Sequence, residues 1–87
     1  MAKTYAIQYS KLVKKELRSL ERSNLVAIVR KIEALASDPY PIGSIKLEGA
    51  SGLRRVRQGD YRIIYEVQND QLIVLVVKVG HRRDVYR

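Results

Sequence analysis

One stretch of the sequence decides the fold. It reads Leu53-Arg54-Arg55-Val56-Arg57-Gln58-Gly59-Asp60-Tyr61-Arg62-Ile63-Ile64-Tyr65-Glu66-Val67. Gly59-Asp60 divides this stretch into two runs, and a glycine at the first central position suits a tight type II′ turn. The pattern predicts a β-hairpin of strands 53–58 and 61–68. A second turn signal at Asn69-Asp70 leads into a third strand over about 71–79.

The register of this hairpin follows if Gly59 and Asp60 are its two central turn residues. The predicted cross-strand pairs are Gln58 with Tyr61, Arg57 with Arg62, Val56 with Ile63, Arg55 with Ile64 and Arg54 with Tyr65. Because side chains alternate between the two faces of a strand, the hairpin has two distinct faces. The predicted core face carries Val56, Tyr61, Ile63, Tyr65 and Val67, and the opposite face carries Arg55, Arg57 and Arg62.

Three arginines on one sheet face need a physical reason. Arg57 and Arg62 lie directly opposite each other in this register, and facing like charges destabilise a sheet by roughly 0.2 to 1 kcal/mol. One interpretation is a solvated face on which Glu48 and Glu66 neutralise part of the charge. We favour the alternative, a surface that binds phosphate, since the rigid guanidinium fork matches the geometry of a phosphate group.

The N-terminal half predicts one strand and two helices. Residues 4–9 are rich in β-formers, and Ser10 suits the N-cap of a helix over residues 11–20. After a break at residues 21–24, apolar residues at helical spacing predict a second helix that begins near Leu25. It ends near Ser37, because the Asp-Pro-Tyr-Pro sequence of residues 38–41 cannot continue a helix. A loop punctuated by glycines joins it to the first strand of the hairpin.

The predicted order of elements is β-α-α-β-β-β, an α+β fold in a single domain of residues 1–87. We expect the N-terminal strand and a helical hairpin to pack on one face of a mostly antiparallel sheet. The apolar run from Leu72 to Val77 predicts that the last strand is central in that sheet. A short tail or helix follows it.

Composition narrows the class of protein. The 87 residues include 17 Lys and Arg against 9 Asp and Glu, a formal net charge of +8 that favours polyanionic partners. Without cysteine, and with one histidine, the chain offers no disulfide scaffold, thiol nucleophile or His-rich metal centre, so we expect no metal and no cofactor. A secretory signal and a membrane-spanning run are not visible, so we expect a cytoplasmic protein without a membrane partner.

A second group of candidate residues follows the last strand, in the segment Gly80-His81-Arg82-Arg83-Asp84-Val85-Tyr86-Arg87. One interpretation is a frayed basic tail, or a tyrosine that packs against the domain. The alternative is part of an RNA site, because an aromatic ring among arginines is typical of single-strand RNA binding.

The remaining side chains limit the chemistry. The sequence has no Walker loop and no recognisable set of paired carboxylates or of serine, histidine and aspartate. Arginine, histidine and tyrosine suit RNA cleavage through its own 2′-OH, since fixed arginines stabilise the charge that develops on the phosphate. Histidine is the side chain best suited to move protons near neutral pH.

These residues resemble a known family, the RelE/ParE toxin superfamily. The resemblance rests on the order of elements, on Lys46-Leu47-Glu48-Gly49, on the hairpin sequence and on the ending Gly80-His81-Arg82-Arg83-Asp84-Val85-Tyr86. It covers nearly the whole chain, and the ending is more typical of the RelE branch. The resemblance implies a toxin of a type II toxin–antitoxin pair that enters the ribosomal A site on the 30S subunit and cuts mRNA there.

The resemblance also implies roles for single residues. Arg62 and Arg82 stabilise the scissile phosphate, Arg55 and Arg57 assist in charge stabilisation and positioning, and Tyr86 stacks on a base or helps to activate the 2′-OH. Lysines often occupy the first two positions in the family, and arginine is a poor proton carrier. His81 or Tyr86 is therefore the expected proton handler. Further RNA contacts are expected from Arg54, Lys78, Arg83 and Arg87.

The implied partners are a RelB-like antitoxin with an acidic segment, the ribosome and mRNA, with DNA reached only through the antitoxin. Two alternatives stay open. One is a ParE-type inhibitor of DNA gyrase, which needs no phosphate-cleaving residues. The other is a non-catalytic module that binds RNA or the ribosome.

Overall fold

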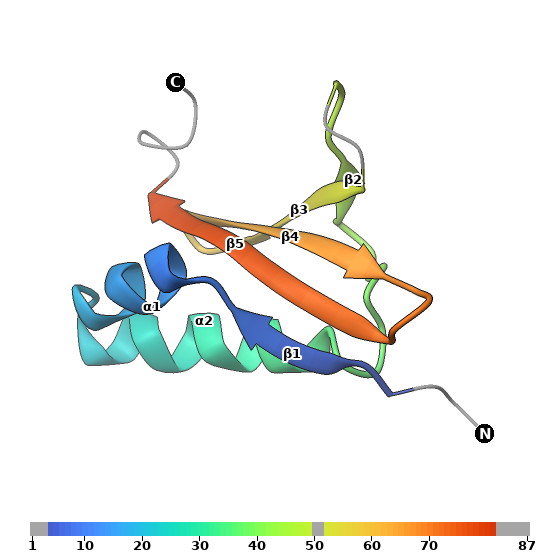
Figure 1. Cartoon of the computed structure of the whole chain (residues 1–87). Coiled ribbons are helices and arrows are strands. Elements are labelled where there is room, and N and C mark those ends of the chain that lie inside the picture. The colour runs from blue at the N-terminus through green and yellow to red at the C-terminus, as the bar shows by residue number, and fades with distance from the viewer. Residues whose placement is uncertain (1–3, 50–51, 82–87) are drawn as a thin grey trace.

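The computed structural model describes residues 4–49 and 52–81. Two helices pack on one side of a five-stranded sheet, which confirms the predicted α+β class (Figure 1). The helices are α1 (Lys11–Arg18) and α2 (Arg22–Ala34). The strands are β1 (Ala6–Tyr9), β2 (Ile45–Lys46), β3 (Leu53–Gln58), β4 (Tyr61–Gln68) and β5 (Ile73–His81). Residues 82–87, where we expected a tail or short helix, lie outside the described residues.

The sheet is mostly antiparallel, with the strand order β1-β5-β4-β3-β2. Strand β5 lies between β1 and β4, so the prediction that the last strand is central is confirmed. Strand β1 joins the sheet itself as an edge strand and runs parallel to β5. Strand β2 forms the other edge, in a region for which we expected only a loop. Two residues between loop segments offer no alternation from which a strand could be recognised.

The β3–β4 hairpin has the predicted register. Gln58 pairs with Tyr61 across the turn, and Arg57 pairs with Arg62. Gly59 adopts a φ of 59°, a left-handed conformation that glycine enters without the steric cost met by other residues. The tight turn therefore fixes which side chains share a face.

The helices begin and end slightly away from their predicted bounds. Ser10 caps α1 as expected, and its Oγ accepts a hydrogen bond of 3.1 Å from the backbone N–H of Val13. Helix α2 begins at Arg22, earlier than the predicted start near Leu25, after an N-cap at Glu21 without a side-chain cap. It ends at Ala34, a few residues before the predicted end near Ser37.

The core lies between the helices and the sheet. The buried apolar side chains are Tyr5, Val13, Ile28, Ile32, Leu35, Val56, Ile63, Tyr65, Val74, Val76 and Val79. The predicted core face of the hairpin is confirmed, because Val56, Ile63 and Tyr65 are buried while Tyr61 and Val67 pack against the cluster. Tyr65 also donates a hydrogen bond of 2.7 Å from Oη to the carbonyl oxygen of Pro39.

A β-bulge alters the register between β4 and β5. Ile64 pairs with Lys78, whereas the next residue, Tyr65, pairs with Val76. The shift keeps Val76 on the core side and places Lys78 on the face opposite the helices. Within the described ranges, neither helix has the length and apolar composition needed to cross a membrane.

Candidate phosphate-binding site

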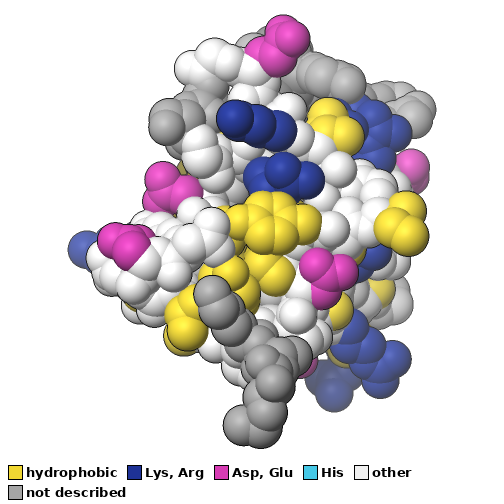
Figure 2. All heavy atoms as spheres, turned by 90° about the vertical axis from the view of Figure 1, so that its right-hand side faces the viewer, with side chains coloured by type: hydrophobic (Ala, Val, Ile, Leu, Met, Phe, Trp, Pro, Cys, Tyr) yellow, Lys and Arg dark blue, Asp and Glu magenta, His cyan; other side chains and the backbone are white. Residues whose placement is uncertain are grey.

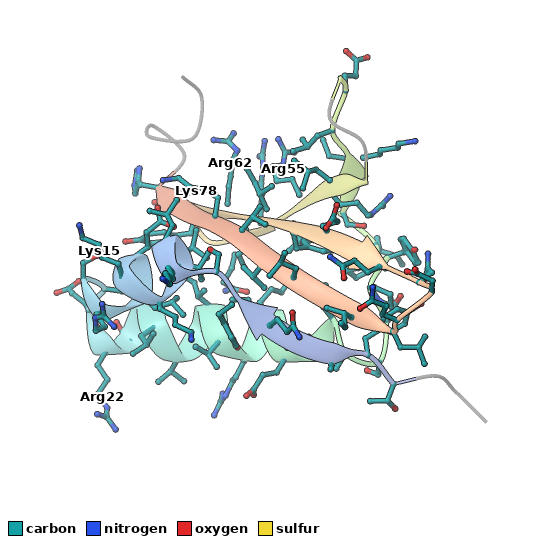
Figure 3. The ribbon with its side chains drawn as sticks, viewed as in Figure 1. Lys15, Arg22, Arg55, Arg62 and Lys78 are labelled. Atoms are coloured by element: carbon teal, nitrogen blue, oxygen red, sulfur yellow. The ribbon has the colours of Figure 1, made fainter. Side chains whose placement is uncertain are left out.

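Three arginines gather on the sheet face that points away from the helices. Arg57 of β3 pairs with Arg62 of β4, and Arg55 lies two residues before Arg57 on the same side of its strand. Figure 3 shows Arg55 and Arg62 projecting side by side from this face, opposite to the helices. We call Arg55, Arg57 and Arg62 the arginine face. The structure thus brings together the three hairpin residues that the sequence placed in one site.

The three guanidinium groups differ in exposure. Only 4% of Arg62 is exposed, whereas Arg55 is half-buried and Arg57 is exposed. The Nε atom of Arg55 is buried without a hydrogen-bond partner among the described residues. Charge that is shielded from water acts more strongly on a neighbouring anion, because the local dielectric constant is lower. Arg62 therefore supplies a shielded positive charge beside two more exposed ones.

A small cavity marks the hairpin end of the arginine face. It has a volume of about 40 Å³ and is lined by Arg57, Gly59, Asp60, Tyr61 and Arg62. The carboxylate of Glu66, which we considered as a partial neutraliser of the arginines, accepts a hydrogen bond of 2.8 Å from the side chain of Gln68. Two residues of the arginine face, Arg57 and Arg62, therefore line this cavity together with the acidic Asp60.

Lys78 lies on the same sheet face, but its charge is balanced. Its Nζ pairs with Oε2 of Glu16 in α1, and Oε1 of Glu16 accepts a hydrogen bond of 2.9 Å from the backbone N–H of Val79. Strand β1 ends at Tyr9 opposite Val76, so β5 beyond that point has an edge that β1 does not cover. Glu16 satisfies one donor of that edge and holds α1 against β5.

His81 lies on the other side of the sheet from Arg62. It pairs with Tyr61, and the two rings meet edge to face at a centroid distance of 5.6 Å and an angle of 79°. Both rings line a cleft of about 240 Å³ between α1 and the end of β5. The structure therefore separates His81 from the arginine face, although both lie near the same end of the sheet.

Arg54 also lies on the helix side of the sheet. It pairs with Tyr65, its Cζ lies 5.0 Å from the ring centroid of Tyr40, and its Nη2 donates a hydrogen bond of 2.8 Å to Oγ of Ser44. This position agrees with the predicted pairing of Arg54 with Tyr65, a residue of the predicted core face. The RNA contact expected from Arg54 stays a prediction.

The remaining candidates, Arg82, Arg83, Tyr86 and Arg87, lie outside the described residues. Glu16 is the residue of this region that sequence reasoning missed. It is the only acidic residue in a helix that also carries Lys11, Lys14, Lys15 and Arg18. A lone acid in a basic helix is a signal for a specific partner, but the sequence does not indicate that the partner is β5. Among the described residues, no group of His, Cys, Asp or Glu side chains could hold a metal ion.

Comparison with known proteins identifies the class to which this fold and this basic face belong. Residues 7–86 match the family described as the ParE toxin of type II toxin–antitoxin systems, parDE. The chain therefore belongs to the RelE/ParE superfamily of type II toxins, as its sequence motifs predicted.

Individual relatives carry RelE-type names. The chain is 31% identical over 86 residues to the putative toxin RelE1 of Methanocaldococcus jannaschii, covering 95% of this chain and 96% of that protein. It is 26% identical over 84 residues to toxin RelG of Mycobacterium tuberculosis, covering 95% and 97%. The RelE chain of the RelE–RelB complex from Pyrococcus horikoshii is 33% identical and superimposes with a TM-score of 0.81, covering 91% of this chain and 96% of that one.

Proposed function

We propose that this protein is the toxin of a type II toxin–antitoxin pair and cuts mRNA in the ribosomal A site by a metal-independent reaction. The observation that carries the proposal is the arginine face, where the buried Arg62 lies opposite the exposed Arg57. Its placement agrees with the roles that the family resemblance implies. RelE-type names among the relatives support the choice of branch.

The arginine face suits attack by the 2′-oxygen of the RNA on the adjacent phosphorus. A bond forms between the 2′-oxygen and phosphorus while the bond from phosphorus to the 5′-oxygen breaks, which leaves a 2′,3′-cyclic phosphate and a free 5′-OH. Negative charge builds up on the phosphate oxygens in the transition state, and preorganised guanidinium groups stabilise it. Arg62 supplies the fixed charge, and Arg55 and Arg57 position the substrate. DNA lacks the attacking hydroxyl.

Proton transfer requires other side chains. The 2′-OH loses a proton and the leaving 5′-oxygen gains one, and arginine is too basic to do either at neutral pH. His81 and Tyr86 are the candidates for these two proton transfers. Arg82 has a different proposed role, which is to stabilise the charge on the phosphate. Because His81 packs on Tyr61 on the far side of the sheet, we favour Tyr86 for this role.

The proposed partners follow from charge and from the relatives. A net charge of +8 favours the RNA-rich surface of the ribosome in the cytoplasm. The Pyrococcus horikoshii relative was solved as a RelE–RelB complex, which supports a cognate RelB-like antitoxin for this chain. An acidic antitoxin segment over the arginine face would compete with RNA for the same guanidinium groups.

Purified ribosomes programmed with a defined A-site codon test the proposal, with cleavage mapped by primer extension. We expect a cut with the wild-type protein and a loss of about a hundredfold or more with Arg62→Ala, since removing one donor to a developing oxyanion has effects of that size. Arg22→Ala is the matched control, because this exposed arginine of α2 points away from the sheet (Figure 3). No cut with wild type, or equal cutting by Arg62→Ala, would contradict the proposal.

The name of the matching family supports a second candidate function, inhibition of DNA gyrase of the ParE type. This activity needs binding but no phosphate chemistry. A supercoiling assay with purified gyrase tests it, and inhibition that survives Arg62→Ala together with an absence of mRNA cleavage would favour this candidate.

A further inference from the structure

A second basic concavity lies on the sheet face opposite the arginine face. It has a volume of about 250 Å³ and is lined by Tyr40, Lys46, Gly52, Arg54, Val67 and Asn69. Lys46 and Arg54 are paired residues of β2 and β3, and Arg54 is paired in turn with the core residue Tyr65. The lining side chains of these strands therefore belong to the helix side of the sheet, beyond the part that the helices cover. We call this concavity the Tyr40 site.

The aromatic ring of this site is held from two directions. Nδ2 of Asn69 donates a hydrogen bond of 2.9 Å to Oη of Tyr40, and Oδ1 of Asn69 accepts one of 2.5 Å from Oη of Tyr5. The guanidinium of Arg54 lies over the ring at 5.0 Å from its centroid. Even so, 46% of Tyr40 remains exposed. The site thus presents a fixed aromatic surface to solvent. Because the ring is already ordered, little side-chain entropy is lost when a ligand binds.

Two cations accompany the ring. Arg54 is oriented by its bond to Ser44, and its Nε is buried without a hydrogen-bond partner among the described residues. Lys46 lies beside it across the strand pair and is exposed. None of the residues that line the site carries a carboxylate. Figure 2 shows basic side chains directly beside a group of hydrophobic ones on this end of the molecule, with acidic side chains around them.

We propose that the Tyr40 site binds one nucleotide of single-stranded RNA. The base stacks on the exposed part of the Tyr40 ring, and the phosphate lies between Lys46 and Arg54. A rigid aromatic surface next to paired cations is the arrangement by which proteins bind single strands without reading their sequence.

This inference goes beyond the proposed nuclease activity. The arginine face and the Tyr40 site lie on opposite sides of one sheet, so the protein contacts RNA from two sides at once. Binding at the Tyr40 site involves no reaction, so it does not depend on cleavage at the arginine face. The presence of two sites predicts that the toxin binds two RNA segments at the same time.

Fluorescence anisotropy with a labelled short oligoadenylate tests the site. Tyr40→Leu removes the aromatic ring, and we expect it to weaken binding about fivefold or more, as loss of one base–aromatic stack does. Tyr40→Phe keeps the ring and removes only the hydroxyl that Asn69 holds, so we expect a clearly smaller loss of affinity than in Tyr40→Leu. Lys46→Gln should weaken binding and flatten its salt dependence, whereas Lys14→Gln, an exposed lysine of α1, should change neither.

Three results would overturn the proposal. Wild-type affinity in Tyr40→Leu excludes stacking on this ring. Equal losses in Tyr40→Leu and Tyr40→Phe, with unchanged circular dichroism, assign the effect to the hydroxyl. A polyglutamate probe that loses more affinity than oligoadenylate in Tyr40→Leu identifies a peptide site. The assay contains no ribosome and measures no cleavage, so its outcome is independent of the A-site experiment.

Discussion

Arg62 combines a permanent charge with almost complete burial, two properties that rarely occur together in one side chain. Its cross-strand neighbour Arg57 carries the same charge in an exposed position. A sheet selected for stability alone would avoid this pair, because like charges directly opposite each other repel. The repulsion between Arg57 and Arg62 is therefore compatible with the proposed role of this face in binding a phosphate group.

Replacing Arg57 should separate stability from activity. We expect Arg57→Gln to raise the free energy of unfolding by roughly 0.2 to 0.5 kcal/mol, because it removes a like-charge pair. The same variant should lose cleavage on programmed ribosomes. Urea denaturation measures the first effect and primer extension the second. Arg22→Gln, which removes the same charge far from the sheet, should alter neither, and a destabilised Arg57→Gln would argue against repulsion at this pair.

Tyr9 makes a prediction about pH. Its partial burial in the core, with a smaller contribution from the Glu33 carboxylate, raises the pKa of Tyr9 above the ordinary value of 10.0. The unfolded chain therefore ionises at lower pH than the folded one, so the associated stability is complete below pH 10 and is lost as pH rises through the folded pKa. We expect Tyr9→Phe to show a smaller loss of stability between neutral pH and the alkaline range in urea denaturation. Parallel curves for the two proteins would contradict this assignment.

At the scale of elements, the hairpin turn determines which arginines meet. The register was predictable because Gly59-Asp60 allows only two residues between the strands, and alternation then assigns each side chain to a face. The same rule assigns Arg54 to the helix side, because Arg54 pairs with Tyr65. The short strand β2 was not predictable, because it is recognisable only from its pairing with β3.

Substitution of Gly59 tests the turn. Space around it is open, since a Cβ built there meets nothing within 4 Å, so the cost of a side chain comes from its φ of 59°. We expect Gly59→Ala to destabilise the protein by about 1 kcal/mol and Gly59→Asn by less, because asparagine tolerates the left-handed region. Thermal denaturation of both variants provides the measurement. Equal stability of all three proteins would show that the turn relaxes freely.

The contact between α1 and β5 was beyond reach of the sequence, because it joins Glu16 to residues more than sixty positions later. Helical periodicity separates the polar side of α1 from its apolar side but carries no information on the partner of Glu16. The helix bounds deviated for a related reason. Helix α2 begins at Arg22 without a side-chain cap, so its start left no capping signal in the sequence, and the apolar periodicity predicted it only from Leu25.

Two variants divide the contribution of Glu16. Glu16→Gln keeps an acceptor for the Val79 N–H but removes the charge that pairs with Lys78. Because Lys78 is one-third exposed, we expect the ion pair to contribute under about 1 kcal/mol. Glu16→Ala also leaves the backbone donor without its partner and should cost about 1 to 3 kcal/mol. A double-mutant cycle with Lys78→Met isolates the free energy of the Glu16–Lys78 ion pair. Equal destabilisation by Glu16→Gln and Glu16→Ala would show that the hydrogen bond to the Val79 N–H contributes nothing further.

At the scale of the whole molecule, the net charge of +8 is divided between surfaces with different roles. Lys15 and Arg22 lie on the helix side, away from the arginine face (Figure 3). These exposed cations attract polyanions over a distance, whereas the buried Arg62 acts only on a group in contact with it. The rate at which RNA associates with the protein should therefore respond to salt differently from the binding of a phosphate at Arg62.

Salt titration can distinguish these roles. RNA affinity should fall linearly with the logarithm of salt concentration, and the slope should shrink by about 0.7 for each phosphate contact removed from a single strand. We expect Arg57→Gln to reduce the slope by that amount and Arg22→Gln to leave it unchanged. Anisotropy over a range of salt concentrations measures both. Equal slopes for all three proteins would mean that Arg57 makes no phosphate contact.

The parallel pairing of β1 with β5 has a consequence for how the protein is made. Ala6 pairs with Ile73, which is synthesised 67 residues later, and β5 also connects β1 to the rest of the sheet. During translation the first strand and both helices leave the ribosome before their central support exists, so the fold closes only when the chain is nearly complete. A chain interrupted before residue 73 lacks the strand that carries Lys78 and His81 and that completes the sheet. Because β5 also pairs with the hairpin strand β4, a truncated chain should lack the support of the arginine face as well as that of β1.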